Sequence, residues 1–339
     1  MRRVARAAAL VAAFAAVVAA SPATALDVNR ADVKAFIDEV CARDHFKRAW
    51  VTKILRAAEL RPPVVEAMNK PAERVRAWYE YRAIFVTDKR IRDGREFVSA
   101  HRAELDAAAG KSGVPAEMIA AILGVETSYG RIIGSYRVLD SLSTLAFEYP
   151  ARAPLFRSEL EQFLLLAREK KLDPLTVQGS YGGAMGAPQF MPSNYRTIAV
   201  DGDGDGRIDL WTSWPDIFAS VAHYFVVHGW HPGEPVIAPA ELWYPGVMGL
   251  PAGRLELNET VGSLHAKGVL FVTSLPAQAP AVFLALREPD GPGYRVGFHN
   301  FSVITRYNRS NLYALAVVEL AAALAAPAEA AATAPGPAP

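Results

Sequence analysis

Glu126 is a single carboxylate at a position where a helix is expected to bury hydrocarbon. Met118, Ile119, Ile122 and Leu123 follow helical spacing, and Glu126 is the next member of that stripe. A carboxyl group among core residues is costly unless it is paired or protonated. An acid held neutral is what general-acid chemistry requires. A Glu in the last helical turn is, however, more often a solvated surface residue, so the rest of the chain must decide.

A glycine-rich segment over residues 178–195 carries Ser180 and Gln189. It lacks the Lys-Ser/Thr ending and the strand-then-helix setting of a phosphate loop, which excludes that function. One interpretation is a series of tight turns without a ligand. The other is the wall of a groove, where glycines let a flat polymer approach the backbone and Gln189 and the hydroxyls supply hydrogen bonds.

A pattern typical of a calcium loop follows directly. Asp201, Asp203 and Asp205 place oxygens at positions one, three and five, with Gly206 at six and Ile208 at eight, as in an EF-hand. Three carboxylates so close together repel one another unless a cation neutralises them. An Asp/Gly turn without metal is the alternative, and we favour a bound ion with a structural role.

The end of this loop departs from the EF-hand pattern. Position twelve is Thr212 in place of the usual bidentate Glu. We expect Asp216, four residues later, to close a lengthened loop as the final ligand. Arg207 would contribute only its backbone carbonyl.

The bulk composition indicates an ordinary globular protein and excludes a strongly charged binding surface. Of 339 residues, 51% are hydrophobic and 10% aromatic, and 36 basic residues against 35 acidic ones give a net charge of +1. A nucleic-acid-binding patch and a polybasic membrane anchor are therefore not expected. Cys41 is the only cysteine, so no disulfide can form within the chain.

The first residues have the pattern of an export signal. Arg2, Arg3 and Arg6 precede an apolar run over residues 7–20, and a small-residue cleavage site follows at residues 21–25. An uncleaved membrane anchor is the weaker interpretation, because the run is short for a spanning helix. We expect a mature chain that starts at Leu26, lies in the periplasm and keeps no transmembrane anchor.

The remaining pattern predicts a mainly α (α+β) protein. Helical spacing dominates residues 27–229 and returns at 311–324, whereas short β-rich runs occupy 254–258, 268–273, 281–286 and 294–298. The predicted units are a signal peptide (1–25), an N-terminal helical domain (26–110), a catalytic core (111–231 and 302–324), a small inserted β domain (232–301) and a disordered Ala/Pro-rich tail (325–339).

Five segments together resemble the lytic murein transglycosylase B family, in the family's order. They are Gly124-Val-Glu126-Thr, Ser180-Tyr-Gly-Gly-Ala-Met-Gly, Gln189-Phe-Met-Pro-Ser, the Asp-x-Asp-x-Asp-Gly loop and Ile304-Thr-Arg-Tyr-Asn308-Arg-Ser. The resemblance covers residues 27–324 and implies a lysozyme-like helical core. It also implies cleavage of the β-1,4 bond between N-acetylmuramic acid and N-acetylglucosamine in peptidoglycan, with a 1,6-anhydromuramoyl product.

The resemblance also implies the site residues. Glu126 matches the catalytic acid and base, and the positions that match the family's glycan groove are Ser180, Gln189, Tyr224, Tyr307, Asn308, Tyr313, Tyr81 and Arg152. The expected calcium ligands are Asp201, Asp203, Asp205, Arg207 and Asp216, with no organic cofactor. Peptidoglycan strands are the expected partner of a monomer that could join other cell-wall enzymes.

Two rival functions stay open at this point. A hydrolysing muramidase would need a second carboxylate, for which Asp140 and Glu148 are the nearest candidates. We expect Asp140 to cap a helix that begins at Ser141, and Glu148 to lie in a loop beside Pro150. A calcium-stabilised wall-binding module without catalysis is the other rival, although tandem calcium repeats are absent from the sequence.

Overall fold

The computed structural model describes residues 24–69, 76–243 and 254–327. Residues 1–23 of the predicted signal peptide and 328–339 of the predicted tail lie outside these ranges. Thr24–Ala25 (β1) pairs antiparallel with Glu59–Leu60 (β2). In the described ranges, no helix combines the length and apolar character that crossing a membrane requires.

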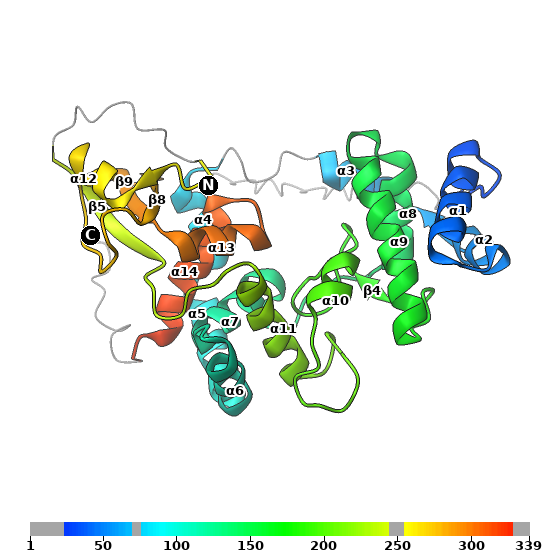
Figure 1. Ribbon diagram of the computed structural model, residues 1–339, viewed down its shortest axis with the longest axis horizontal. Coiled ribbons are helices and arrows are strands. Elements are labelled where there is room, and N and C mark those ends of the chain that lie inside the picture. The colour runs from blue at the N-terminus through cyan, green and yellow to red at the C-terminus, as the bar shows by residue number, and fades with distance from the viewer. Residues whose placement is uncertain (1–23, 70–75, 244–253, 328–339) are drawn as a thin grey trace, which may run out of the picture.

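One group of helices forms the end of the molecule at the right of Figure 1. The helical spacing predicted over residues 27–229 is confirmed in its first two helices, whose buried apolar residues recur every three or four positions. Its elements are α1 (Ala31–Asp44), α2 (Arg48–Arg56), α3 (Pro62–Asn69), α8 (Val138–Glu148), a 3₁₀ turn (Pro150–Arg152) and α9 (Ala153–Lys170).

A second group surrounds α7 (Ala116–Thr127). Every residue of α7 is buried except Glu117 and Glu126. The predicted single apolar stripe was therefore too narrow, because neighbouring helices pack against α7 from several directions. The helices of this group that pack on one another around α7 are α4 (Trp78–Phe85), α5 (Asp88–Ala100), α6 (Arg102–Ser112), α11 (Trp214–Val227), α13 (His299–Tyr307) and α14 (Asn311–Ala325).

The helices of residues 26–110 are divided between these two groups. α1 packs against α9 and α3 against α8, whereas α4, α5 and α6 pack against α14, α7 and α11. Helices that are neighbours in the sequence therefore need not pack against one another. The bounds of the N-terminal domain stay a prediction.

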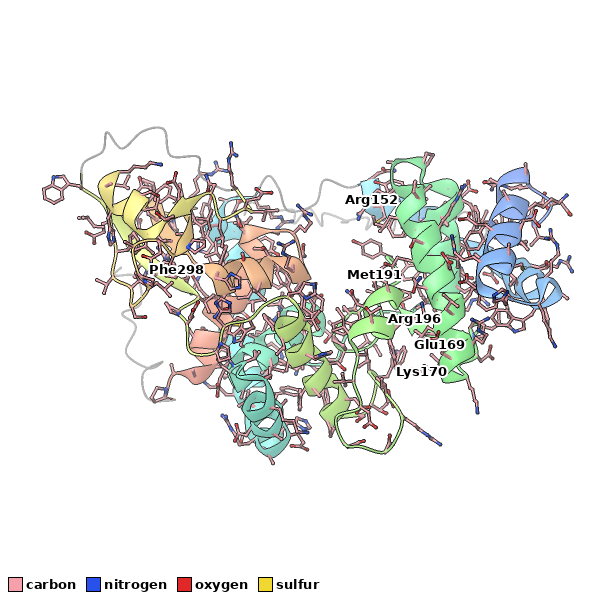
Figure 2. The ribbon with its side chains drawn as sticks, viewed as in Figure 1. Arg152, Glu169, Lys170, Met191, Arg196 and Phe298 are labelled. Carbon is pink, nitrogen blue, oxygen red and sulfur yellow. The ribbon has the colours of Figure 1, made fainter. Side chains whose placement is uncertain are left out.

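The glycine-rich segment of residues 178–195 connects the two groups of helices. Tyr136–Arg137 (β3) pairs antiparallel with Gln178–Gly179 (β4), and α10 (Pro192–Ile198) follows. Arg196 on α10 makes a bidentate pair with Glu169 on α9, at 2.7 and 2.9 Å, which ties the segment to the first group (Figure 2).

The small sheet is antiparallel throughout, with the strand order β6-β8-β9-β5-β7. Its elements are β5 (Ile237–Leu242), β6 (Glu259–Thr260), α12 (Val261–Ala266), β7 (Val269–Leu270), β8 (Pro280–Glu288) and β9 (Gly291–Gly297). The predicted β runs correspond to β7, β8 and β9. The run at 254–258 is not a strand, and β5 and α12 were not predicted.

β8 joins the sheet to the helical core because it is buried on both faces. Val282, Leu284 and Leu286 belong to the main core, whereas Ala281 and Phe283 belong to the sheet's own cluster with Val296 and Phe298 among others. Side chains alternate along a strand, so one strand can serve two cores. The sheet is thereby fixed against α4.

Gly124 is expected to be essential for the approach of α14 to α7. A Cβ at this position would lie 2.8 Å from Tyr129 and 2.9 Å from Leu320. Gly124→Ala should therefore overpack the core and lower the free energy of unfolding by about 1–3 kcal/mol, measured by urea denaturation.

Gly110 provides the matched control, since a Cβ there meets nothing within 4 Å. Gly110→Ala should raise stability by about 0.5–1 kcal/mol through helix propensity. Equal effects of the two substitutions would contradict the packing argument.

Candidate active site

A groove of about 1150 Å³ receives the side chain of Glu126. Its lining residues come from segments far apart in the sequence. Met68 is the first of the described lining residues and Leu312 the last. Among the described lining residues Glu126 is the single acidic one, and Arg76, Arg152 and Arg309 are the basic ones. One carboxyl group in a cationic and partly apolar groove is the central chemical feature of the site.

Glu126 lies in the last turn of α7 and is half-buried. The helix ends at Ser128, whose left-handed conformation (φ 50°) lets the Tyr129 amide donate to the Leu123 carbonyl at 2.9 Å. The Tyr313 hydroxyl on α14 donates to Glu126 Oε1 at 2.7 Å. Two packed helices therefore fix both the position and the orientation of the carboxyl group.

Three tyrosine side chains form a series of ring contacts that begins at the carboxyl group of Glu126. The ring centroids of Tyr313 and Tyr307 are 6.5 Å apart, and those of Tyr307 and Tyr224 are 4.6 Å apart. The Tyr307 hydroxyl donates to the Pro188 carbonyl at 2.7 Å, and the Tyr224 hydroxyl donates to the Arg306 carbonyl at 2.8 Å. The series connects α11, α13 and α14 with the glycine-rich segment.

Burial keeps these hydroxyls protonated. It raises the pKa of Tyr224 to about 12. It also raises the pKa of Tyr307 and Tyr313 well above their usual range, and the negative charge of Glu126 acts in the same direction. Tyr313 is consequently a hydrogen-bond donor to Glu126 at any physiological pH.

The structure brings most of the predicted groove residues together. Ser180, Gln189, Tyr307, Asn308 and Arg152 line the groove with Glu126. The Arg152 guanidinium lies over the Phe156 ring, 5.5 Å from its centroid, at the end of the first helix group (Figure 2).

Tyr81, Tyr224 and Tyr313 are instead buried, with exposed fractions of 1%, 5% and 2%. They do not belong to the described lining of the groove. A direct contact of these three with substrate stays a prediction, and their positions favour support of the groove wall.

The glycine-rich segment turns sharply beneath Ser180 and Gln189. Ser180 Oγ accepts a hydrogen bond from the Ala184 amide at 3.1 Å. Gln189 has a left-handed backbone (φ 53°), and its side-chain amide donates to the Ile133 and Gly186 carbonyls at 3.2 and 2.9 Å. These bonds hold the segment in place as a rigid wall.

Several lining residues were missed by the sequence analysis. Arg76, Tyr181, Arg309 and residues 284–286 of β8 all face the groove. Arg309 follows Asn308 inside a matched segment, so its position was a usable signal. The strand residues gave none, because their apolar character indicates only burial.

The residues that follow Glu126 at the end of α7 do not belong to the described lining of the groove. Thr127 is buried and its hydroxyl donates to the Ala187 carbonyl at 2.9 Å, while the Tyr129 hydroxyl donates to the Arg90 carbonyl at 2.9 Å. The space left by Gly124 is filled by Tyr129 and Leu320. These groups therefore fasten α7 and leave the groove to others.

The two rival carboxylates lie outside the described lining of the groove. Helix α8 begins at Val138, so Asp140 does not cap a helix at Ser141; it is buried, accepts from the Glu59 amide at 2.9 Å and pairs with Arg137 at 2.8 Å. Glu148 is the last residue of α8, not part of a loop, and pairs with Arg30. Both carboxylates serve packing.

The predicted metal loop gathers its acidic groups. Carboxylate oxygens of Asp201, Asp203 and Asp205 lie within 4.8 Å of one another. The Gly206 and Gly204 amides donate to Asp201 at 2.8 and 2.6 Å and lower its pKa.

Asp216, on α11, is placed differently from the three clustered carboxylates. It is buried, and its two oxygens accept from the Gly202 and Asp209 amides at 2.7 Å each. The Arg207 amide donates to Asp205 at 2.7 Å. Asp216 closes the loop by hydrogen bonds, and the ligand roles of Asp216 and of the Arg207 carbonyl stay predictions.

Comparison with known proteins relates this geometry to an enzyme family. The Transglycosylase SLT domain matches residues 29–322. Membrane-bound lytic murein transglycosylase B of Escherichia coli (strain K12) is 40% identical over 306 residues, which cover 88% of this chain and 83% of that protein.

Two solved structures have the same fold. One is the Escherichia coli lytic transglycosylase Slt35 in complex with calcium, with a TM-score of 0.80, 39% identity and coverage of 89% of this chain and 96% of that one. The other is SltB3 from Pseudomonas aeruginosa in complex with NAG-anhNAM-pentapeptide, with a TM-score of 0.73, 31% identity and coverage of 85% and 77%.

Asp140 and Glu148 should differ sharply in their effect on stability. Asp140→Ala leaves Arg137 and the Glu59 amide without their buried partner, and we expect a loss of about 3 kcal/mol in the free energy of unfolding. Glu148→Ala removes a partly exposed ion pair and should cost less than about 1 kcal/mol. Urea denaturation measures both, and a larger loss for Glu148→Ala would contradict the assignment.

Proposed function

Because the chain belongs to the lytic murein transglycosylase family and is thus an enzyme that cleaves the glycan strands of peptidoglycan, we propose that Glu126 performs both proton transfers of the reaction. The bond cleaved is the β-1,4 bond between N-acetylmuramic acid and N-acetylglucosamine. The observation that carries the proposal is that Glu126 is the one acidic side chain among the described residues of the groove.

The first step is protonation of the glycosidic oxygen by the Glu126 carboxyl group as the bond to the anomeric carbon breaks. Glu126, now ionised, then accepts the proton of the muramoyl C6 hydroxyl, whose oxygen bonds to the anomeric carbon. The products are a free 4-hydroxyl on N-acetylglucosamine and a 1,6-anhydromuramoyl end. Glu126 finishes protonated, ready for another cycle.

This sequence needs no second carboxylate and no attacking water, unlike the two-carboxylate glycosidases. The attack occurs within one sugar, so positioning supplies much of the rate. The relative from Pseudomonas aeruginosa holds a NAG-anhNAM compound, which supports an anhydro product here as well.

The remaining groove residues position the sugar. Ser180 and Asn308 both line the groove, and we assign them to the N-acetyl group beside the developing positive charge. Tyr313 orients the carboxyl group through its 2.7 Å hydrogen bond. Tyr307, which lines the groove, and Tyr224, which is buried behind it, hold the wall in place. Export to the periplasm, where peptidoglycan lies, and action as a monomer complete the proposal.

Glu126→Gln should lower kcat by at least about a thousandfold, because the amide keeps the shape and cannot transfer the proton. The measurement is release of soluble muropeptides from purified sacculi. Mass spectrometry identifies the wild-type product, since an anhydro end is one water lighter than a hydrolysed end.

Tyr313→Phe is the matched control, because it keeps the acid and removes only the hydrogen bond to it. We expect a decrease of about tenfold in kcat with the anhydro product unchanged. Near wild-type turnover by Glu126→Gln, or a hydrolysed product from the wild type, would refute the mechanism.

We also propose that the loop over residues 201–216 binds a calcium ion with a structural role. Three clustered carboxylates supply the hard oxygen ligands that calcium prefers. Gly204 and Gly206 have positive φ (80° and 86°) and open space around them, which suits a loop that wraps an ion. The Slt35 relative was solved in complex with calcium.

Calcium at saturating concentration should raise the Tm of the wild type by about 5 °C, since a ligand that binds only the folded state stabilises it. Asp201→Asn keeps an acceptor for the two glycine amides and removes the charge, so it should abolish most of this shift. Differential scanning calorimetry with calcium and with EDTA measures it.

Asp290→Asn, on the exposed turn after β8, serves as the control and should keep the full shift. A calcium response that persists in Asp201→Asn would contradict the loop as the binding site.

A further inference from the structure

The end of the molecule that carries α2 has a local excess of positive charge. The whole chain is nearly neutral, with 36 basic residues against 35 acidic ones. The segment that consists of α2 and the residue before it nevertheless contains no acidic residue. Its basic residues are Lys47, Arg48, Lys53 and Arg56. A net charge near zero therefore conceals a segregation of charge on the surface.

Two of these basic residues lie on the outer face of α2. The buried residues of the helix are Val51, Ile54 and Leu55. Lys53 and Arg56 are exposed and share the opposite face, because they are spaced by three residues. Arg48 pairs with Asp38 on α1, so the acidic group nearest to α2 on that side is already occupied.

The C-terminal end of α9 adds further cations beside α2. The Arg168 guanidinium lies over the Phe46 ring, 4.2 Å from its centroid, and Phe46 stacks on Trp50 of α2 with centroids 5.4 Å apart. Figure 2 shows Lys170 at the same end of α9. The two elements together form one surface, which we call the cationic face. Its residues are Lys47, Lys53, Arg56, Arg168, Lys170 and Lys171.

Carboxylates do not neutralise the cationic face. Among the described residues, none of its six cations has an ion-pair partner within 4.0 Å. Glu169 lies between two of them in the sequence, but it makes the bidentate pair with Arg196. Asp173 is exposed, and it accepts a hydrogen bond from the Leu175 amide at 3.0 Å. The face therefore keeps most of its positive charge available to a partner.

The apolar run near the start of the chain leads directly to this face. β1 (Thr24–Ala25) pairs with β2, which follows α2, and the Leu26 amide donates to the Ala58 carbonyl at 3.0 Å. Three residues separate Thr24 from the run at residues 7–20. The four Cα–Cα steps between Ala20 and Thr24 span at most about 14 Å. A chain whose apolar run enters a bilayer thus brings α2 to the bilayer surface.

The composition of the face suits a bilayer surface with anionic lipids. Each Lys or Arg near such a surface adds to the attraction. Trp50 is half-buried beside these cations, and tryptophan is favoured at the boundary between membrane and water. The six cations do not belong to the described lining of the groove, so a contact through them leaves the groove open.

We propose that the cationic face is a peripheral membrane-binding surface, whose ligands are the phosphate groups of anionic phospholipids. It holds the enzyme at the bilayer while the groove remains accessible to glycan strands. The inference does not depend on which residue transfers the proton in the groove.

Co-sedimentation with vesicles tests this inference, with the partition coefficient as the readout. We expect the purified protein to bind vesicles of phosphatidylglycerol and phosphatidylethanolamine. Binding to vesicles of phosphatidylcholine should be at least about tenfold weaker, because their surface carries no net charge. Added salt should weaken the binding, since ions screen charges that are exposed to solvent.

Lys53→Gln/Arg56→Gln removes two positive charges and should lower the partition coefficient about twentyfold, at about fivefold per charge. Lys53→Arg/Arg56→Lys keeps both charges and should bind as the wild type does. The matched control is Arg92→Gln/Lys111→Gln, which removes the same two residue types from exposed positions on α5 and α6. It should also keep the wild-type value. Thermal unfolding of each variant confirms that folded proteins are compared.

Equal binding of the wild type to both kinds of vesicle would overturn the inference, as would equal partition coefficients for the two Gln double variants. A loss of binding to purified sacculi by Lys53→Gln/Arg56→Gln, with vesicle binding unchanged, would also overturn it by identifying a wall polymer as the partner. Release of soluble muropeptides by the same variants tests the proposed chemistry separately, and we expect it to be unchanged.

Discussion

The structure depends on placing one carboxyl group in the half-buried last turn of a helix that is otherwise enclosed. α7 is buried along its length except at two glutamates, and Glu126 in the last turn is the one that opens into the groove. Enclosure fixes the backbone beneath the carboxyl group, and Tyr313 fixes its orientation at 2.7 Å. The general-acid role that we propose for Glu126 requires such firm placement, because the rate of proton transfer falls steeply when the acid is misplaced.

The groove needs walls that no single segment of the chain can supply. β8 contributes because its alternating side chains enter two cores, which holds residues 284–286 against the helical body and beside the groove. The glycine-rich segment contributes the opposite wall, fixed by the Gln189 and Ser180 hydrogen bonds. The small sheet therefore belongs structurally to the site, although it lies far from Glu126 in the sequence.

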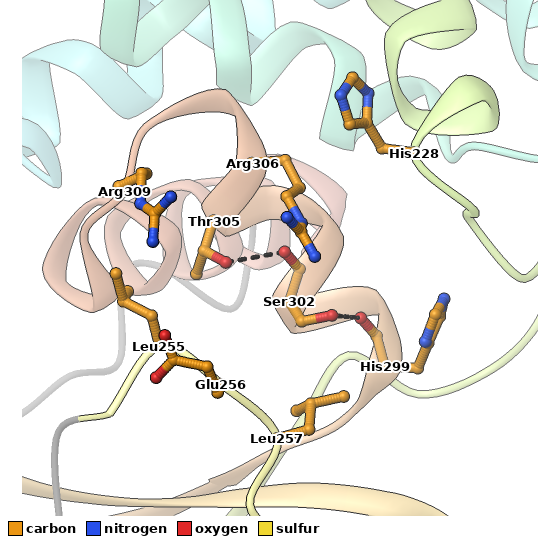
Figure 3. Close-up of a pocket in the computed structure, with 9 residues that line it drawn as sticks. All are labelled: His228, Leu255, Glu256, Leu257, His299, Ser302, Thr305, Arg306 and Arg309. Carbon is orange, nitrogen blue, oxygen red and sulfur yellow. Dashed lines mark hydrogen bonds between the residues drawn. The ribbon is translucent and has the colours of Figure 1, made fainter.

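A series of aromatic rings connects the groove with a second pocket, of about 550 Å³, which is lined by residues of α13 among others (Figure 3). His228 lines the second pocket and stacks on Tyr224, which packs on Tyr307, and Tyr307 packs on Tyr313, the partner of Glu126. Raised pKa values keep the three tyrosine hydroxyls protonated, so they remain hydrogen-bond donors near neutral pH. The same rings thus support both the Glu126 carboxyl group and the second pocket.

The sequence by itself determined the helical spacing of the segments that form α1 and α2, the acidic loop and the family, and it singled out Glu126 as the candidate acid. Each of these is a local pattern, set by spacing along the chain or by a short motif. It did not determine that α7 is enclosed on all sides, or that Asp140 is a buried structural partner of Arg137.

Tertiary structure alone decided which tyrosines face the groove and which stand behind it, and it brought Arg76, Arg309 and β8 to the site. It also placed Leu320 and Tyr129 against Gly124. The physical reason is that exposure and charge pairing depend on packing between segments distant in the chain, and residue spacing within one segment carries no record of those neighbours.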